Sequence, residues 1–283
     1  MVERRPTLGI LAHVILILGV LVVALPVYIT FVASTHTAQE VVQRPMPMLP
    51  GSHFIENYTA ALQGGSHGAG STAAVGRMMF VSLVSALIIT FGKIAISLLS
   101  AFAIVYFRFR FRMFFFWAIF VTLMLPVEVR IGPTYKVVSD LGMLNSYAGL
   151  TVPLIASATA TFLFRQFFLT VPEELVEAAR IDGAGPMRFF KDILVPLSAT
   201  SIAALFVIQF IYGWNQYLWP LLVTTNEDMY PVVMGIKSMI SGGDAATEWN
   251  AVMATAILAM LPPAAVVILM QKWFVKGLVD TEK

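Results

Sequence analysis

The chain has 283 residues, of which 58% are hydrophobic and only 12% are charged, with a formal net charge of +2 and no cysteine. A soluble domain carries about 25% charged residues, so this composition excludes a soluble globular protein, a disordered chain and a nucleic-acid-binding protein. The missing cysteines exclude disulfides, thiolate metal sites and cysteine nucleophiles. The four histidines are far apart, with no pair at zinc-ligand spacing, so we predict no metal site.

Long stretches of the chain contain no Asp, Glu, Lys or Arg. About 18 or more apolar residues without charge indicate a membrane-spanning helix, and most of these stretches reach that length. The uncharged stretches are residues 6–39, 113–127, 141–164, 193–226 and 249–271. Between Arg77 and Arg108 the only charge is Lys93. We therefore predict an all-α, polytopic membrane protein with six transmembrane helices.

The predicted helices follow one another along the chain. The first covers residues 8–32, and its apolar core is too long for a cleaved signal peptide, so we expect an uncleaved anchor. The other five are expected at residues 78–107, 114–127, 150–168, 198–222 and 251–275. The last contains Pro262-Pro263, where we expect a break. The transmembrane domain thus spans 8–275, between an N-terminal segment 1–7 and a tail 276–283.

The orientation follows from Lys and Arg, which favour the cytoplasmic side of a membrane. They are most frequent near both termini, in the RFRFR segment at 108–112 and in the connection 165–196. Six helices place both termini on one side, so we predict that both are cytoplasmic. The connections 39–76 and 223–250 then lie outside. The polar, Gly-rich passage 39–76, which includes GGSHGAGST at 64–72, is predicted to be an irregular loop.

Three charged residues lie inside or beside the predicted helices. Lys93 is about halfway along the second helix, where a charge costs at least about 2.5–3.5 kcal/mol. It faces the pathway of an anionic substrate, or it pairs with a buried partner such as a backbone carbonyl or Glu128, or it makes a snorkelled contact. Glu128 and Arg130 follow Pro126, so we expect them at a bent outer helix end, as a local ion pair or gate contact.

The segment WNQYLWP at 214–220 ends the fifth predicted helix. Amphipathic aromatic rings favour the headgroup level of a membrane, which predicts that Trp214, Tyr217 and Trp219 form an aromatic belt. The alternative is functional, with Asn215 and Gln216 facing a polar pathway.

The connection 165–196 has the pattern of a helical hairpin. Thr170 and Glu173 fit a capping box at the start of a first helix, and Gly183 suits the position after its end, where φ is positive. Pro186 can open a second short helix, which Pro196 then closes.

The first of these helices has a face of small residues. Leu175, Ala178 and Ala179 allow another backbone to approach closely, with glutamates around them, so we predict a docking surface. The alternative is an amphipathic helix on the inner leaflet. Such helices are usually rich in Lys and Arg, whereas this one begins with Glu173 and Glu174, which anionic lipid would repel.

This segment resembles a known motif. Glu177-Ala178-Ala179, Gly183 and Ile193-Leu194-Val195-Pro196 are similar in spacing to the EAA loop of ABC importer permeases, with Val195 as a mild departure from the usual Ile-x-Leu-Pro ending. The chain resembles the permeases of carbohydrate-type importers, in the branch of the maltose transporter's smaller permease, which implies a type I importer fold. It is also similar to a membrane subunit of importers of sn-glycerol 3-phosphate. That similarity is carried by residues 123–131, 146–168, 174–190, 211–222 and 277–283.

The resemblance implies that the EAA loop forms coupling helices, which sit in a groove of a cytoplasmic ATPase. The residues that take these roles are Glu177, Ala178, Ala179, Asp182, Gly183 and Pro196. The implied partners are a second permease, an ATP-binding-cassette ATPase dimer that binds the ATP, and a periplasmic or extracellular substrate-binding protein. The implied location is the bacterial cytoplasmic membrane. The expected substrate is sn-glycerol 3-phosphate or a glycerophosphodiester, with a sugar or another polyol as the alternative.

Other classes of protein fit the sequence less well. Neither Gly92-Lys93-Ile94 nor Gly235-Ile236-Lys237-Ser238 fits the phosphate-binding loop of an ATPase, and no catalytic triad can be assembled from the chain positions. Glu177 and Asp182 lie close together, but they are in a solvated loop, where we expect a surface role and not acid–base catalysis. A stand-alone secondary carrier would show inverted repeats, and none is clear. We predict a transport subunit that is not an enzyme.

Overall fold

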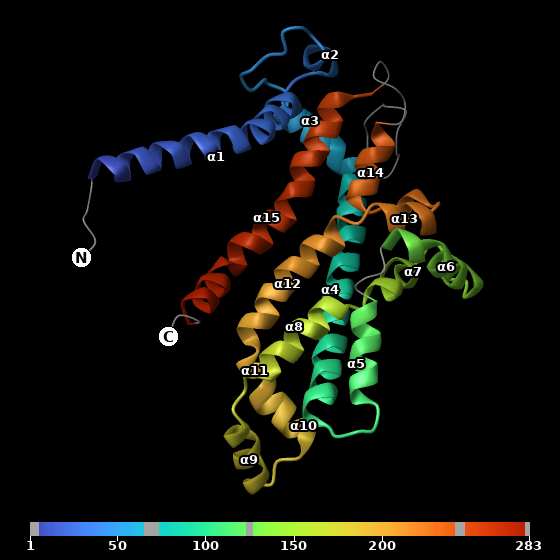
Figure 1. Cartoon of the computed structure of the whole chain (residues 1–283). Coiled ribbons are helices and arrows are strands. Elements are labelled where there is room, and N and C mark those ends of the chain that lie inside the picture. The colour runs from blue at the N-terminus through green and yellow to red at the C-terminus, as the bar shows by residue number, and fades with distance from the viewer. Residues whose placement is uncertain (1–5, 65–73, 123–126, 241–246, 281–283) are drawn as a thin grey trace. The chain divides into compact units, whose positions relative to one another are not determined.

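The computed structural model describes residues 6–64, 74–122, 127–240 and 247–280, and these residues form helices and connections without a strand (Figure 1). The helices are α1 Pro6–Ser34, α2 Ala38–Val41, α3 Phe54–Gln63, α4 Val75–Tyr106, α5 Arg112–Val121, α6 Val127–Asp140, α7 Tyr147–Thr151, η1 Val152–Leu154, α8 Ala158–Phe168, α9 Glu173–Ile181, α10 Pro186–Phe189, η2 Phe190–Leu194, α11 Val195–Leu197, α12 Ala199–Trp214, α13 Leu218–Val223, η3 Glu227–Met229, α14 Val232–Met239 and α15 Trp249–Asp280.

Among the residues that the structure describes, three helices are long and apolar enough to cross a membrane. They are formed by Gly9–Ser34 of α1, by Val75–Tyr106 and by Trp249–Lys272 of α15. Helices are thereby confirmed where the first, second and sixth spans were predicted. Pro262 and Pro263 lie inside α15, so the break expected there is not present.

The other predicted spans are shorter or bent. Helix α5 has only 10 residues and ends at Val121, and the continuation through 123–126 lies outside the described residues. The fourth span is a pair of helical segments, Tyr147–Leu154 and Ala158–Phe168, bent by 46°. The fifth is a helix up to Trp214, and the predicted continuation to Leu222 is wrong because the chain leaves the helix before α13. The number of six spans stays a prediction.

The connections 39–76 and 223–250 contain more regular structure than expected. The expectation of an irregular passage over 39–76 is wrong for α3, whose apolar positions bury Tyr58 and Ala61. Most of the Gly-rich segment, at 65–73, lies outside the described residues. The connection 223–250 likewise contains η3 and α14.

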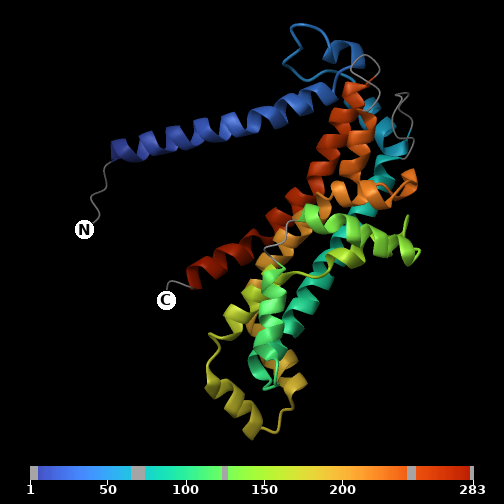
Figure 2. The same ribbon diagram turned by 45° about the vertical axis from the view of Figure 1, so that its right-hand side comes forward.

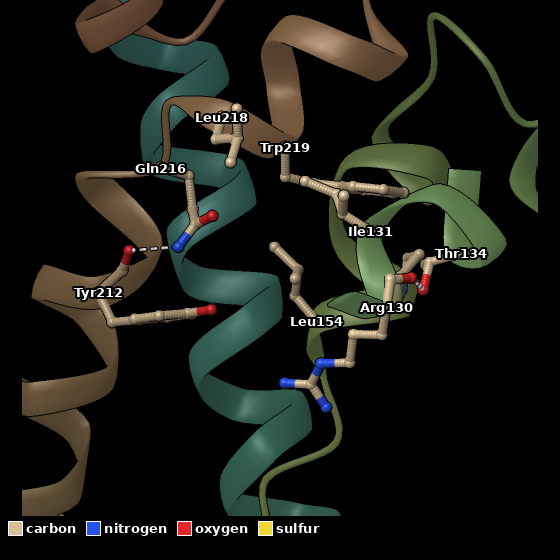
Figure 3. Close-up of a pocket in the computed structure, with 9 residues that line it drawn as sticks. Arg130, Ile131, Thr134, Leu154, Tyr212, Gln216, Leu218 and Trp219 are labelled. Carbon is tan, nitrogen blue, oxygen red and sulfur yellow. Dashed lines mark hydrogen bonds between the residues drawn. The ribbon is translucent and has the colours of Figure 1, made fainter. Parts of the chain in front are cut away.

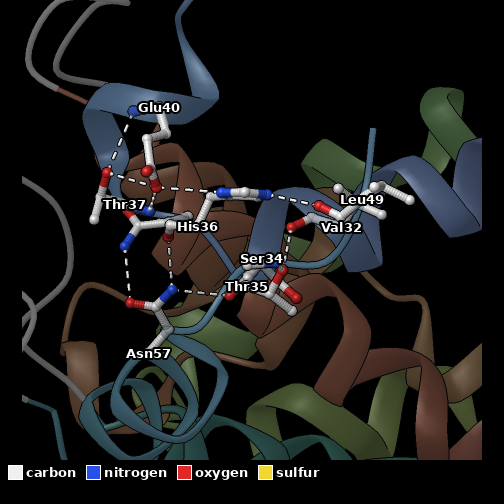
Figure 4. Close-up of polar contacts among 10 residues, drawn as sticks. Val32, Ser34, Thr35, His36, Thr37, Glu40, Leu49 and Asn57 are labelled. Carbon is white, nitrogen blue, oxygen red and sulfur yellow. Dashed lines mark hydrogen bonds and ion pairs between the residues drawn. The ribbon is translucent and has the colours of Figure 1, made fainter. Parts of the chain in front are cut away.

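The chain divides into two compact units. Unit 1 comprises Met1–Arg77 and Gly235–Leu261, and unit 2 comprises Met78–Met234 and Pro262–Lys283. Within unit 1 a polar network follows the end of α1 (Figure 4). The His36 ring contacts Glu40 Oε2 at 3.2 Å and the Leu49 carbonyl at 2.8 Å, and Asn57 Nδ2 donates to the Ser34 and His36 carbonyls. These bonds give the connection after α1 a defined conformation.

Unit 2 has a core at the end formed by α6, α7 and α13. Trp219 is 4% exposed and its Nε1 donates to the Gly149 carbonyl at 3.0 Å, while Trp214 is 1% exposed. The predicted aromatic belt is therefore wrong for both tryptophans. The chain turns back after α12 and packs these rings inside the protein. The residues of this core are Val81, Val138, Leu150, Trp219, Val223 and Met229.

Helices α9 and α10 lie at one end of unit 2 in both views (Figures 1 and 2), and a second core includes residues of both. It combines residues of α4, α8, α9, α10, η2 and α12. A Cβ at Gly213 would lie 2.9 Å from the Ala86 Cα, so α12 packs closely against α4 in this unit. The buried residues of the second core are Ile94, Leu98, Ala101, Phe102, Ala160, Phe164, Phe168, Ala179, Phe189, Leu194 and Leu205.

Candidate functional sites

The helix α9 ends in a glycine turn. Gly183 has φ +72°, its N–H donates to the Arg180 carbonyl at 3.1 Å, and the Ala184 N–H donates to the Ala179 carbonyl at 2.8 Å. These two bonds form a Schellman motif, which satisfies the last carbonyls of the helix. The predicted position of Gly183 with positive φ is confirmed. A side chain added there would meet nothing within 4 Å, so the backbone conformation alone favours glycine.

The start of α9 differs from the prediction. Pro172 is the N-cap residue and no side chain caps the helix, so the capping box of Thr170 and Glu173 is wrong. Thr170 lies two residues before the cap and its Oγ1 donates to the Phe167 carbonyl at 2.7 Å. Glu173 and Glu174 lie in the first turn, where negative charge is favoured by the helix dipole.

The residues of the predicted small-residue face of α9 do not lie on one surface, because some are buried and others are exposed. Ala179 is 5% exposed and packs into the second core of unit 2, so its prediction as a docking residue is wrong in this structure. Its small size is needed inside the chain, against the membrane helices. Ala178, Glu177 and Asp182 are exposed, and Leu175 is 37% exposed.

The second helical segment of the loop ends at Leu197, one residue after Pro196. Helix α10 continues as a π-helix, η2, and then as α11, and Pro196 lies exposed inside α11. The predicted end at Pro196 therefore agrees with the structure to within one residue. The chain bends by 72° between Pro186–Leu197 and α12. At the bend, the buried Ser198 donates from its Oγ to the Leu194 carbonyl at 2.6 Å.

Aromatic contacts attach this loop to the long helices. The ring of Phe190 lies 4.9 Å from that of Phe102, and the ring of Phe189 lies 5.3 Å from that of Tyr106. Tyr106 also donates to the Phe168 carbonyl at 3.3 Å. A packed interior transmits displacement with little compression, so a force on α9 and α10 reaches α4 and α8.

A basic cavity forms the second candidate site, and Lys93 lies at its wall. Lys93 is only 6% exposed; its Nζ donates to Gln209 Oε1 at 3.0 Å and lies 3.7 Å from the ring centroid of Tyr212. The hydrogen bond thus goes to a side chain of α12 and not to a backbone carbonyl. The side chain of Glu128, the other expected partner, lies outside the described part of the chain.

The cavity has a volume of about 710 Å³ and is lined by residues of α4, α5, α6, α8 and α12. Its polar lining residues are Lys93, Ser100, Thr122, Arg130, Ser157, Thr159, Thr161, Gln209 and Tyr212. A smaller cavity of about 190 Å³ adjoins it through Arg130, Leu154 and Tyr212 (Figure 3). Figure 3 shows Arg130 and Tyr212 on opposite sides of this space, with Gln216 bonded to the Tyr212 carbonyl at 3.0 Å.

The structure therefore brings together Lys93, Arg130 and Gln216 of the predicted pathway residues. Asn215 caps the end of α12 and is not among the residues that line either cavity. Gln209 and Tyr212 also line the cavity but were not predicted from the sequence. Their signal is a glutamine inside an uncharged helix, followed after three residues by a tyrosine, which places both on one helical face.

No group of three or more His, Asp or Glu that could hold a metal ion occurs in the described ranges. The glycine-ended loop and the cation-lined cavity are thus the two arrangements with functional chemistry. The cavity has charge for an anionic ligand, and the loop has an exposed surface backed by a rigid core.

Comparison with known proteins agrees with the presence of an exposed loop and a basic cavity in a membrane protein. Residues 93–280 match the family described as "Binding-protein-dependent transport system inner membrane component". The chain is 62% identical to the sn-glycerol-3-phosphate transport system permease protein UgpE of Agrobacterium fabrum, over the whole of both chains. It is 61% identical to the protein of the same name from Pectobacterium atrosepticum, again over the whole of both.

A solved structure has a similar fold. It is a bacterial ABC transporter involved in the import of the acidic polysaccharide alginate, and one of its chains matches with a TM-score of 0.76 and 21% identity. The match covers 97% of this chain and 99% of the other. At this identity the likeness concerns the fold alone.

Proposed function

The chain belongs to the binding-protein-dependent transport system inner membrane components, and from that premise we propose that it imports sn-glycerol 3-phosphate. As a member of this family it is a multi-pass membrane permease subunit of an ABC importer and not an enzyme. The observation that supports this choice of substrate is the sequence identity of 62%, over the full length, to a permease named for sn-glycerol 3-phosphate. Glycerophosphodiesters, which share the glycerol phosphate group, are a related substrate class.

The proposed assembly contains a second permease, a dimer of cytoplasmic ATPase subunits and a periplasmic or extracellular substrate-binding protein. ATP is bound by the ATPase, so this chain needs no cofactor. The proposed location is the bacterial cytoplasmic membrane, with both termini inside. The family description supports the binding protein and the inner membrane directly.

We propose that the loop from Arg165 to Pro196 couples the permease to the ATPase. The exposed residues Glu177, Ala178 and Asp182 form the contact, and Gly183 gives the turn that directs α10 back to the membrane helices. The packing of Phe189 and Phe190 on α4 supports this role, because closure of the ATPase can move membrane helices only through a stiff element.

The substrate pathway is proposed to pass along the cavity that contains Lys93 and Arg130. Such a cavity gives an anionic substrate an attractive route at membrane depth, where charged side chains usually mark a pathway. Alternating access then exposes the cavity to each side of the membrane in turn.

The test is uptake by the reconstituted complex. The four kinds of subunit are assembled in proteoliposomes with ATP inside, and uptake of radiolabelled sn-glycerol 3-phosphate is compared with that of glycerophosphocholine, glycerol and maltose. We expect uptake of sn-glycerol 3-phosphate that requires ATP and the binding protein. Transport of a neutral sugar in its place, or transport by this chain alone without ATP, would contradict the proposal.

A further inference from the structure

The basic cavity of unit 2 has a composition suited to one kind of ligand group. Its lining includes two cations, Lys93 and Arg130, and no carboxylate among the residues that the structure describes. Both cations line the same cavity, so their positive charges repel each other across it. This repulsion is unfavourable when the cavity is empty, and an anion between the two cations adds two attractions that outweigh it.

Lys93 is held at the cavity wall by neutral groups. Its ammonium group has three N–H donors, of which one bonds to Gln209 Oε1 and another faces the ring of Tyr212. Gln209 is itself 6% exposed, so both members of the pair are fixed inside the protein. No carboxylate among the described side chains lines this cavity beside Lys93, and a charge that is kept at membrane depth usually has a functional role.

The break before α8 places the start of a helix at the same cavity. Residues 156–159 line it, and Ser157 is the N-cap of α8, with its Oγ accepting from the Ala160 N–H at 3.2 Å. The first turn of a helix carries a partial positive charge. Broken membrane helices commonly present such ends to anionic substrate groups, so the end of α8 adds to the two side-chain cations.

We propose that Lys93, Arg130 and the first turn of α8 form a phosphate-binding subsite, which holds the dianionic phosphate group of the substrate in transit. This inference rests on the proposed function and names what the cavity recognises. Gln209 and Tyr212 are positioning residues that hold the Lys93 ammonium at the wall. Two cations match a phosphomonoester with two negative charges better than a phosphodiester with one, so this subunit selects monoesters.

The experiment measures uptake of sn-glycerol 3-phosphate by the complete complex, together with assembly and basal ATP hydrolysis. Gln209→Glu has the same shape but gives Lys93 a permanent counter-ion, and Lys93→Met removes the charge. Both should lower kcat/KM for uptake at least about tenfold, the loss expected for one charge-assisted hydrogen bond. Lys93→Arg, which keeps the positive charge, should retain most of the wild-type kcat/KM. The matched control is Lys136→Met on α6, an exposed lysine paired with Asp140, which should change nothing.

The outcomes separate the two proposals. If the wild-type complex does not take up sn-glycerol 3-phosphate, the proposed function fails. If the wild type transports it and Gln209→Glu retains normal uptake in an assembled complex, the phosphate subsite is refuted. Should Lys93→Met fail to assemble, Arg130→Gln decides, because the exposed Arg130 side chain can be replaced without opening a core. Unchanged uptake in that variant would equally overturn the proposal, and a tenfold loss would support it.

Discussion

The coupling loop and the basic cavity lie in the same unit but are built in different ways. The loop is formed by neighbouring residues, its outer surface is exposed, and its shape depends on one glycine turn and on aromatic packing. The cavity is formed by several helices that are far apart in the sequence, and its central contact joins Lys93 to a residue 116 positions away. The loop therefore acts through shape and the cavity through charge. Substitutions in the loop should uncouple hydrolysis from transport, whereas substitutions in the cavity should change the response to substrate.

The largest effect is expected at the glycine turn. Gly183→Val places a β-branched residue at φ +72°, which costs about 1–2 kcal/mol or more and redirects the chain after α9. We expect uptake to be abolished while the helices still insert. Gly185→Val is the matched control, since Gly185 has φ −69° and equally open surroundings. Equal uptake by the two variants, measured in proteoliposomes, would show that the turn has no role.

The two neighbouring alanines of α9 should behave differently. Ala179→Leu overfills the second core of unit 2, which typically costs about 1–3 kcal/mol, so we expect a lower Tm for the purified chain and reduced uptake. Ala178→Leu adds the same side chain on the exposed face, so Tm should stay the same while the ATPase binds less well. Thermal unfolding and the amount of ATPase retained on purification measure both effects. A fall in Tm for both variants alike would contradict the division of this face.

These differences show what the sequence could reveal. The loop was predictable because its motif is local: Gly183 follows a helix pattern at the distance that a glycine cap requires. The burial of Ala179 was not predictable, because α9 has small residues on more than one side and only its packing against α4 and α8 selects one of them. Likewise the tryptophans of WNQYLWP look amphipathic in isolation, and only the return of the chain through α13 buries them.

The cavity was predictable only in part. A charge inside an uncharged helix identified Lys93, since such residues are rare and usually functional. Its neighbours Gln209 and Tyr212 carry no charge, and their contact with Lys93 depends on how α4 and α12 pack. Pro153 and Ser157 gave local signals for a helix break, but the apolar run from 150 to 168 favoured one continuous span.

A milder effect is expected at the rim of the coupling surface. Glu177 is exposed, so a contact with the ATPase is partly solvated and contributes about 0.2–1 kcal/mol. Glu177→Ala should therefore lower uptake only a few-fold, and less so at high salt, because salt screens exposed charges. Uptake rates at low and high ionic strength measure this. A complete loss of uptake would mean that charge, and not shape, dominates the loop.

The smallest effect is expected in the polar network of unit 1, which belongs to neither region. The Thr37 N–H, with His36 and the Thr37 hydroxyl, lowers the pKa of Glu40 below its usual 4.5. A lowered pKa gives stability that is present above about pH 4.5 and is lost as the pH falls through the folded-state pKa. Hydrogen exchange of residues 35–51, corrected for intrinsic rates, should show this network loosening only in acid. Glu40→Gln should remove the acid dependence, and uptake near neutral pH should stay unchanged. Loosening between pH 6 and 8 would contradict this assignment.

The most direct test of the account is a cross-link from the exposed face of α9. The chain has no cysteine of its own, so Ala178→Cys introduces a single thiol, and Ala179→Cys provides a buried control. In the assembled complex, a short bifunctional thiol reagent should join Ala178→Cys to a cysteine in the ATPase and leave Ala179→Cys unlinked. An impermeant reagent added outside intact cells should label neither. Labelling of Ala178→Cys from outside, or an assembled complex in which it never cross-links to the ATPase, would show that this loop does not couple the permease to ATP hydrolysis.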